Sequence, residues 1–137
     1  MGKGTKAILL VDHGSRLEAA NAALEEIASL VASQSGDFLV EVAHMELAEP
    51  SIREGLRRCV AAGATDITVH PYMLGPGRHA TRDIPRLVRE AAREFPHVSC
   101  RVTPPLGVHS LLAEVVLVRV REARVETERP AQRETPR

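Results

Sequence analysis

Four short β-rich stretches alternate with four longer segments of helical character, and this alternation constrains the fold more than any other feature. The strand-like stretches lie near 6–12, 38–45, 65–70 and 97–103, and the helical segments lie near 16–34, 50–62, 80–95 and 109–124. Such alternation is typical of a parallel sheet, because each parallel connection needs a crossover long enough to hold a helix. We therefore expect a three-layer α/β fold, in which an open, parallel, four-stranded sheet has helices on both faces.

The length of the chain and the composition of its end predict the domain organisation. At 137 residues, the chain has the size of one domain with one hydrophobic core. From about Val125 onward, Glu, Thr, Arg, Pro and Gln dominate, and such a composition does not offset the entropy cost of ordering. We predict a single domain over 1–124 and a disordered C-terminal tail over 125–137.

Charge, aromatic content and cysteine usage exclude several classes of partner. Lys and Arg number 18, as do Asp and Glu, and aromatic residues make up 2%, so the basic surface and stacking platforms of nucleic-acid binders are missing. No apolar run approaches the roughly 20 residues of a membrane span, and the N-terminal apolar stretch is too short for a signal sequence. Cys59 and Cys100 form no C-x-x-C pair, so we expect free thiols. These properties predict a cytoplasmic protein that binds neither nucleic acid nor membranes.

The first candidate site is the run Asp12-His13-Gly14-Ser15-Arg16, which follows an apolar strand-like stretch. Open α/β sheets bind ligands beyond the carboxyl ends of their strands. His13 could be a metal ligand, a general base, a phosphate acceptor, or a histidine that only hydrogen-bonds the backbone at the strand end. Gly14 permits a close approach by a ligand, Ser15 can donate a hydrogen bond or cap, and Arg16 brings a permanent cation to a helix start. The loop therefore suits a ligand with carboxylate or phosphate groups.

A second cluster follows the third strand-like stretch. His79 is expected in the loop Gly75-Pro76-Gly77-Arg78-His79, where the two glycines permit unusual backbone angles and the proline stiffens the path. Taken alone, His79 could equally be a solvated loop histidine. Arg78 and Arg82 flank it and offer forked donors that match carboxylates, although either one alone could belong to a solvated charged face.

Glu46 follows the second strand-like stretch and could meet His13 and His79, because parallel strands end at the same edge of a sheet. Two imidazoles and one carboxylate form an open site suitable for a divalent metal such as Fe²⁺ or Co²⁺. The same ligand types suit Ni²⁺ and Zn²⁺, so they leave the metal open. The remaining histidines rank lower: second-line candidates are His70 and His109, and surface or packing positions are expected for His44 and His97.

Four segments of the chain resemble the small class II chelatases of cobalamin and sirohaem biosynthesis, the CbiX and SirB proteins. The matching segments are DHGSR at 12–16, MELAEPSI at 45–52, VHPYMLGPGRHATRDIP at 69–85 and PLGVH at 105–109. They occur in the order of that family, within residues 6–120. The resemblance implies a chelatase-like fold, a flavodoxin-like unit that corresponds to one half of the longer family members. It also implies a lyase that inserts Co²⁺ or Fe²⁺ into sirohydrochlorin, a tetrapyrrole with many carboxylates. Because the metal is a substrate, the resemblance implies no permanently bound cofactor. Longer members contain two such halves in one chain, whereas short members pair two chains, so the resemblance also implies a homodimer.

The resemblance also implies roles for the candidate residues. His13 and His79 match the metal-site histidines of the family, and Glu46 matches an acidic residue of the same pocket. Metallation needs a loosely held metal and acceptors for two pyrrole protons, and neutral imidazoles meet both needs near pH 7. We expect the two histidines to handle the metal and the protons, with Glu46 orienting a histidine or relaying a proton. We expect arginines to bind the carboxylates of the substrate and aliphatic side chains to contact its ring. The residues expected to contact the substrate are Ser15, Arg16, Met73, Leu74, Gly75, Arg78 and Arg82.

Two other functions would use the same residues. A non-catalytic carrier of metal or tetrapyrrole would bind its ligand stoichiometrically without accelerating metallation. A phosphoryl-transfer enzyme would use His13 as the phosphate acceptor, but such enzymes carry an Arg before the His-Gly pair. This chain has Asp12 there, whose charge would repel a phosphate, so phosphoryl transfer ranks below the chelatase.

Overall fold

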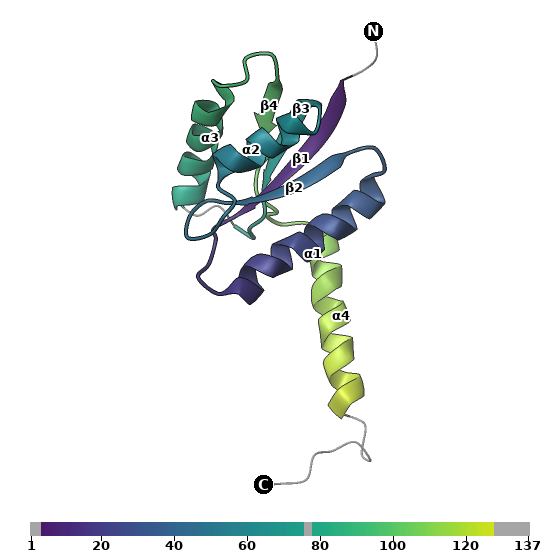
Figure 1. Ribbon diagram of the computed structural model, residues 1–137. Helices are drawn as coiled ribbons and strands as arrows, with labels where there is room; N and C mark the ends of the chain where they lie inside the picture. The colour runs from purple at the N-terminus through teal and green to yellow at the C-terminus, as the bar shows by residue number, and fades with distance from the viewer. Residues whose placement is uncertain (1–3, 76–77, 128–137) are drawn as a thin grey trace. The chain divides into compact units, whose positions relative to one another are not determined.

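In the computed structural model, which describes residues 4–75 and 78–127 but not the side chains of residues 78–81, four strands form one sheet (Figure 1). The strands are β1 (Thr5–Asp12), β2 (Leu39–His44), β3 (Ala64–Pro71) and β4 (Ser99–Val102). They are ordered β2-β1-β3-β4, and every neighbouring pair is parallel. The expected open parallel sheet is therefore confirmed, and its strand order is that of flavodoxin-like folds.

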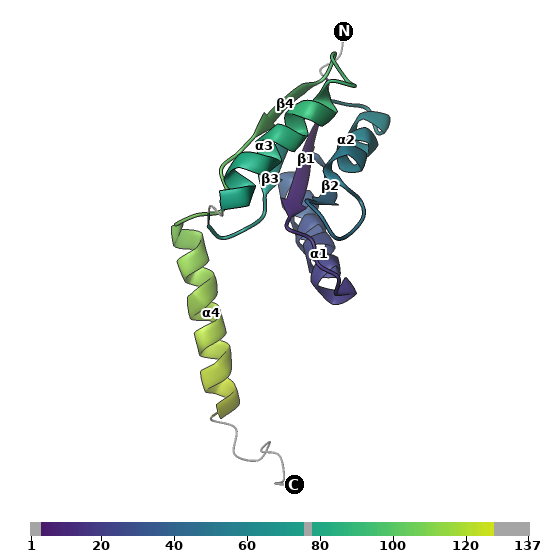
Figure 2. The same ribbon diagram turned by 90° about the vertical axis from the view of Figure 1, so that its left-hand side faces the viewer.

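Helices follow the strands in alternation, as expected. They are α1 (Glu18–Ser35), α2 (Ile52–Ala61), α3 (Arg78–Ala92) and α4 (Ser110–Thr127). Helix α1 packs on one face of the sheet, and α2 and α3 pack on the other, as Figure 1 and Figure 2 show. The three-layer arrangement is therefore confirmed. None of the helices in the described residues combines the length and the apolar character needed to cross a membrane.

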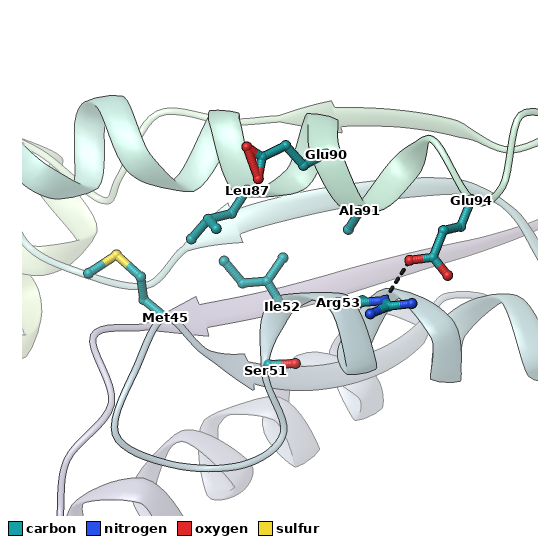
Figure 3. Close-up of a pocket in the computed structure, with 8 residues that line it drawn as sticks. All are labelled: Met45, Ser51, Ile52, Arg53, Leu87, Glu90, Ala91 and Glu94. Carbon is teal, nitrogen blue, oxygen red and sulfur yellow. Dashed lines mark ion pairs between the residues drawn. The ribbon is translucent and has the colours of Figure 1, made fainter.

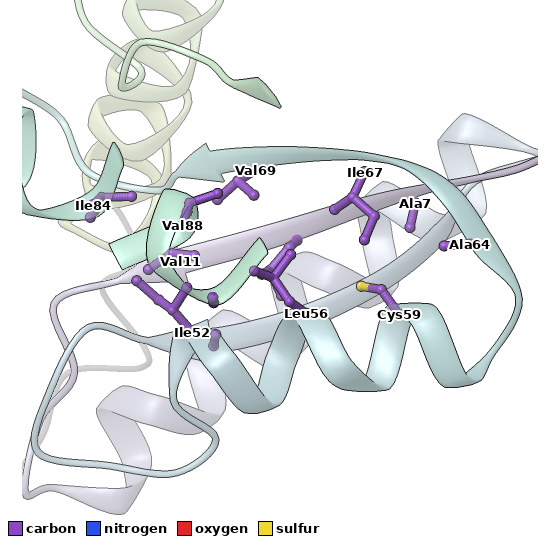
Figure 4. Packing of buried hydrophobic residues seen from close by; sticks show 13 residues of the cluster. Ala7, Val11, Ile52, Leu56, Cys59, Ala64, Ile67, Val69, Ile84 and Val88 are labelled. Carbon is purple, nitrogen blue, oxygen red and sulfur yellow. The ribbon is translucent and has the colours of Figure 1, made fainter. Parts of the chain in front are cut away.

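The larger apolar cluster lies between the sheet and the helices α2 and α3 (Figure 4). Its buried members recur at every second position along β1 and at steps of four and three along both helices, the periods that place side chains on one face. They are Ala7, Leu9, Val11, Ala43, Ile52, Leu56, Cys59, Ala64, Ile67, Val69, Ile84, Val88 and Ala91. Burial raises the pKa of the Cys59 thiol to about 12. Cys59 and Cys100 are both free cysteines, as expected.

A smaller apolar cluster lies on the opposite face, beneath α1. Leu24 and Ala28 of α1 pack there with Leu10 of β1, and partly buried side chains of β2 surround them. The same face becomes polar over β3 and β4, where the Arg101 guanidinium donates to Asp66 Oδ1 at 2.7 Å. Helix α1 therefore covers the apolar half of this face.

The chain divides into two compact units, Met1–Gly107 and Val108–Arg137. The first unit contains the sheet, α1 to α3 and both apolar clusters. The second unit contains α4, which continues to Thr127 and thus into the segment expected to be a tail. Residues 128–137 lie outside the described residues, and the single domain over 1–124 with a disordered tail stays a prediction.

Candidate active site

The loops after β1 and β2 run side by side at the carboxyl edge of the sheet, because β1 pairs directly with β2. Their backbones stay hydrogen-bonded beyond the strand ends: the Met45 amide donates to the Asp12 carbonyl at 2.9 Å, and the Glu46 amide donates to the His13 carbonyl at 3.1 Å. The side chains of His13 and Glu46 are both exposed. An accessible imidazole and an accessible carboxylate therefore start from backbone positions that one hydrogen bond joins.

Helix α1 holds the second half of the first loop through Asn21. The Asn21 Nδ2 donates to the Ser15 carbonyl at 2.7 Å, and the Ser15 amide donates to Asn21 Oδ1 at 3.0 Å. Ser15 Oγ accepts from the Leu17 amide at 3.0 Å, so its own O–H can still donate to a ligand. Arg16 is exposed, which leaves its guanidinium accessible to an anion.

The loop after β3 leaves the sheet beside β1, where the Tyr72 amide donates to the Val11 carbonyl at 2.6 Å. Met73 is half-buried and packs against the larger apolar cluster, whereas Leu74 is 70% exposed. The carbonyls of Met73 and Leu74 accept from the amides of residues 106–107 at 3.0 and 2.8 Å. Leu74 is thus the more accessible of the two aliphatic side chains expected to contact the ring.

The expected loop position of His79 is wrong: His79 belongs to the first turn of α3, which follows β3 and begins at Arg78. The side chains of both residues lie outside the described part of the chain. Gly75 and Arg82 are exposed on either side of them. His13 directly follows β1, and His79 lies in the helix that follows β3, so both belong to the connections on either side of the point where the strand order reverses. Open α/β sheets bind ligands at such a switch point.

Within the described residues, no group of three or more His, Cys, Asp or Glu side chains lies close enough to hold a metal ion. The expected metal site contains His79, whose side chain is not among them. The assignment of His13 and His79 as metal ligands therefore stays a prediction.

A hydrogen-bonded histidine–carboxylate pair, which the sequence analysis did not single out, lies next to this edge. His44 ends β2, is only 2% exposed, and has Nδ1 at 2.6 Å from Oδ1 of Asp12, the last residue of β1. The expected surface or packing position of His44 is thus a buried one with a charged partner. No local sequence signal reveals the pair, because it depends on the register in which β1 and β2 align Asp12 with His44 and so place both side chains on the same face.

A cleft of about 640 Å³ opens between the start of α1 and the loop after β2. Ser15 and Arg16 line one side of it, and His44, Leu47 and Glu49 line the other. This volume lies within the range of small-molecule sites. Two of the candidate substrate-binding residues therefore share a cleft, which lies on the β2 side of the His13 loop.

The CbiX family model matches residues 7–123. The chain belongs to the CbiX family. The chloroplastic sirohydrochlorin ferrochelatase of Arabidopsis thaliana is 48% identical over 113 residues, which cover 82% of this chain and 50% of that protein. The sirohydrochlorin cobaltochelatase of Methanopyrus kandleri is 36% identical over 138 residues, covering 85% of this chain and 96% of that protein.

A solved structure agrees with this family assignment. The crystal structure of the sirohydrochlorin chelatase SirB from Bacillus subtilis subspecies spizizenii in complex with cobalt superimposes with a TM-score of 0.79 and 31% sequence identity. The match covers 86% of this CbiX chain and 50% of the SirB chain. The chain thus spans about half the length of SirB and of the Arabidopsis relative. The resemblance expected from the four sequence segments is confirmed.

The groove between α2 and α3 of this CbiX protein is a separate feature (Figure 3). It has a volume of about 430 Å³, with Met45, Ile52 and Leu87 as apolar lining. Arg53 Nε pairs with Glu94 Oε2 at 2.5 Å across it. Among the described residues, none of the candidate site residues lines the groove, so it is not the candidate active site.

The two second-line histidines make defined hydrogen bonds in this CbiX chain. His70 Nδ1 lies 2.7 Å from Thr103 Oγ1, whose hydroxyl donates to the Pro104 carbonyl at 2.8 Å. A hydroxyl has one hydrogen, so His70 Nδ1 must donate, which leaves Nε2 without a proton in the neutral ring. Burial lowers the pKa of His70, which favours that neutral ring. His109 Nδ1 accepts from the Leu111 amide at 3.1 Å, at the start of α4 in the second unit.

Proposed function

We propose that this CbiX protein is a sirohydrochlorin cobaltochelatase or ferrochelatase, a lyase that inserts Co²⁺ or Fe²⁺ into sirohydrochlorin for cobalamin or sirohaem biosynthesis. The observation that carries the proposal is the match to the Methanopyrus kandleri cobaltochelatase, which covers 85% of this chain and 96% of that protein. The exposed imidazole of His13 at the carboxyl edge of the sheet supports it.

The reaction exchanges one divalent cation for the two N–H protons of the macrocycle. We assign the metal to His13 and His79, because imidazole binds Co²⁺ and Fe²⁺ and an open site can release them. As the pyrrole nitrogens take the metal, each histidine gives it up, and the ring nitrogen freed in this way can accept one of the two pyrrole protons and pass it to water. Glu46, whose amide is bonded to the His13 carbonyl, orients a histidine or relays a proton.

The substrate is an anion with many carboxylates, and the charged candidates suit it. Arg16 and Arg82 are exposed and can donate paired hydrogen bonds to carboxylates, and Arg78 is assigned the same role from the sequence. Leu74, Met73 and Gly75 form the loop assigned to the ring, and the Ser15 O–H is assigned to a polar group of the substrate. No resident cofactor is needed, because the metal is itself a substrate.

We also propose that the active form is a homodimer. This chain covers 50% of SirB at a TM-score of 0.79, so two copies are needed to match the length of SirB. Light scattering after gel filtration is expected to give twice the chain mass of 14.9 kDa, about 30 kDa. A mass near that of one chain at all concentrations would contradict the homodimer. The cytoplasmic location stays a prediction.

The decisive experiment is an anaerobic absorbance assay of sirohydrochlorin metallation with Co²⁺ and, separately, with Fe²⁺. The wild type is expected to accelerate metallation, and His13→Ala and His79→Ala are each expected to reduce the rate by about 100-fold or more. His97→Ala is the matched control, because His97 is exposed and precedes β4 at the opposite edge of the sheet. It is expected to retain the wild-type rate.

The carrier is the second candidate, and the same assay separates it from the chelatase. A carrier would bind the metal or the macrocycle at a fixed stoichiometry, and the rate of metallation would equal the uncatalysed rate. A folded wild-type protein that accelerates metallation with neither metal would overturn the chelatase proposal. The faster metal, in turn, assigns the protein to cobalamin or to sirohaem biosynthesis.

A further inference from the structure

A carboxylate and an imidazole join the two strands whose loops carry His13 and Glu46. Asp12 ends β1 directly before His13, and His44 ends β2 two residues before Glu46. The distance of 2.6 Å between His44 Nδ1 and Asp12 Oδ1 is that of a charge-assisted hydrogen bond. His44 is 2% exposed and the Asp12 side chain 22%, so water competes little for this bond.

The backbone around the pair leaves the two loops little freedom. The amides of Met45 and Glu46 donate to the carbonyls of Asp12 and His13, at 2.9 and 3.1 Å. A Cβ atom on Gly14 would lie 1.7 Å from the Glu46 carbonyl oxygen, which shows how closely the loops approach. The Asp12–His44 bond adds the side-chain link to these backbone contacts. Shifting either loop would break all of them together.

A purely stabilising role explains the pair poorly. Taking a carboxylate and an imidazole out of water costs free energy that their attraction only partly returns, and apolar residues at such positions are often as stable or more so. The hydrogen bond is directional, however, and a pair of apolar side chains would not fix the same geometry. The pair therefore suits a task that needs position rather than stability.

We propose that the Asp12–His44 pair is a positioning element, which fixes the backbone from which His13 and Glu46 act. The role of the pair in metal insertion rests on the proposed function, because only that reaction requires His13 and Glu46 to be held in place toward the same substrate. The ordering of the His13 loop is a property of the free protein and can be measured without the reaction.

Two substitutions at one position separate the hydrogen bond from packing. His44→Asn keeps an N–H donor at the place of Nδ1, whereas His44→Phe keeps a ring of similar size without a donor. Asp12→Ala removes the carboxylate that accepts the hydrogen bond. Because Asp12 is less buried than His44, this variant replaces His44→Phe if the latter does not fold. For each variant, kcat and KM are measured for metal and for sirohydrochlorin, with thermal unfolding as the check on folding. NMR spectra of the protein with carbon-13-labelled histidine give the ring signal of His13. It is assigned as the signal that is missing in His13→Ala.

The expected result is a loss of turnover and of loop order in His44→Phe and in Asp12→Ala. The kcat of these variants falls roughly 10- to 100-fold, as for residues that orient metal ligands, while KM for sirohydrochlorin stays close to that of the wild type. Their His13 signal broadens or splits. His44→Asn restores most of kcat and a single sharp signal. The double variant is no slower than either single one, because both changes remove the same bond.

Two results would overturn the inference. The first is a wild-type kcat and a single sharp His13 signal in both His44→Phe and Asp12→Ala. The second is an equal loss in His44→Asn and His44→Phe, because the donor at Nδ1 would then be irrelevant. If the wild type does not metallate sirohydrochlorin, the proposed function fails, and the His13 signal alone decides the ordering of the loop.

Discussion

Gly14 is the residue at which the first two loops of the candidate active site come closest. Its φ of 90° is one that L side chains rarely adopt, and a Cβ atom would lie 1.7 Å from the Glu46 carbonyl oxygen. Gly14→Ala must therefore displace the loop after β2 as well as strain its own backbone. We expect the free energy of unfolding to fall by about 2–4 kcal/mol, and metallation to be lost, in urea titrations and the absorbance assay.

Gly36 provides the control for backbone strain alone. Its φ is 77°, and no atom other than those of Gly36 and its two chain neighbours lies within 4 Å of the place of a Cβ. Gly36→Ala is expected to cost about 1 kcal/mol and to leave metallation unchanged. If Gly14→Ala costs no more than Gly36→Ala, the close contact between the two loops is not maintained in solution.

His70 makes stability depend on pH. Burial lowers its pKa, so the unfolded chain binds this proton more tightly than the native protein does. The contribution of neutral His70 to stability is therefore complete above the unfolded pKa of about 6.5, and it is lost as the pH falls below that value. In urea titrations at about pH 7.5 and 5.5, His70→Asn is expected to reduce the loss of stability on acidification. The variant can still donate to Thr103, so a loss as steep as that of the wild type would contradict the assignment.

At the scale of elements, α2 depends on a capped first turn. Ser51 Oγ accepts from the Glu54 amide at 3.2 Å, which satisfies one of the free N–H groups at the start of the helix. Ser51→Ala is expected to lower the free energy of unfolding by about 1 kcal/mol in urea titrations. Ser33→Ala is the control, since exposed Ser33 lies within α1 and its Oγ donates to the Leu30 carbonyl at 2.9 Å. It is expected to change stability by less than about 0.5 kcal/mol, and equal losses would contradict a role for the cap.

The order of the elements follows from local patterns, but their faces do not. The helical character of residues near 50–62 and 80–95 predicts α2 and α3, and the β-rich stretches predict the strands. The strand order β2-β1-β3-β4 decides that α1 packs on one face of the sheet and that α2 and α3 pack on the other. Each crossover is right-handed in parallel sheets, so the direction of each step along the sheet decides the face that its helix covers.

At the scale of the whole molecule, both apolar clusters lie within Met1–Gly107. A chain that ends at Gly107 therefore retains all buried members of its core. We expect it to unfold cooperatively in urea, with native-like far-ultraviolet circular dichroism for the sheet and its three helices. A gradual transition without cooperativity would instead favour the single domain over 1–124, in which the last helix is part of the fold.

The sequence by itself determined the alternation of strands and helices, the family and the loop positions of His13 and Glu46, whereas His79, expected in a loop, lies in the first turn of α3. These follow from periodicity and from motifs that are each local, since an apolar stretch before His13 suffices to place it at a strand end. The parallel sheet then brings those ends to one edge, because all parallel strands point in the same direction.

Only the tertiary structure decided which residues meet behind that edge. Asp12 and His44 are 32 positions apart in the chain, and they meet because β1 and β2 pair in one particular register. Gly14 approaches Glu46 for the same reason. A shift of one residue in that register would turn every side chain of a strand to the other face. The register is set by the packing of both apolar clusters together, and no local pattern records it.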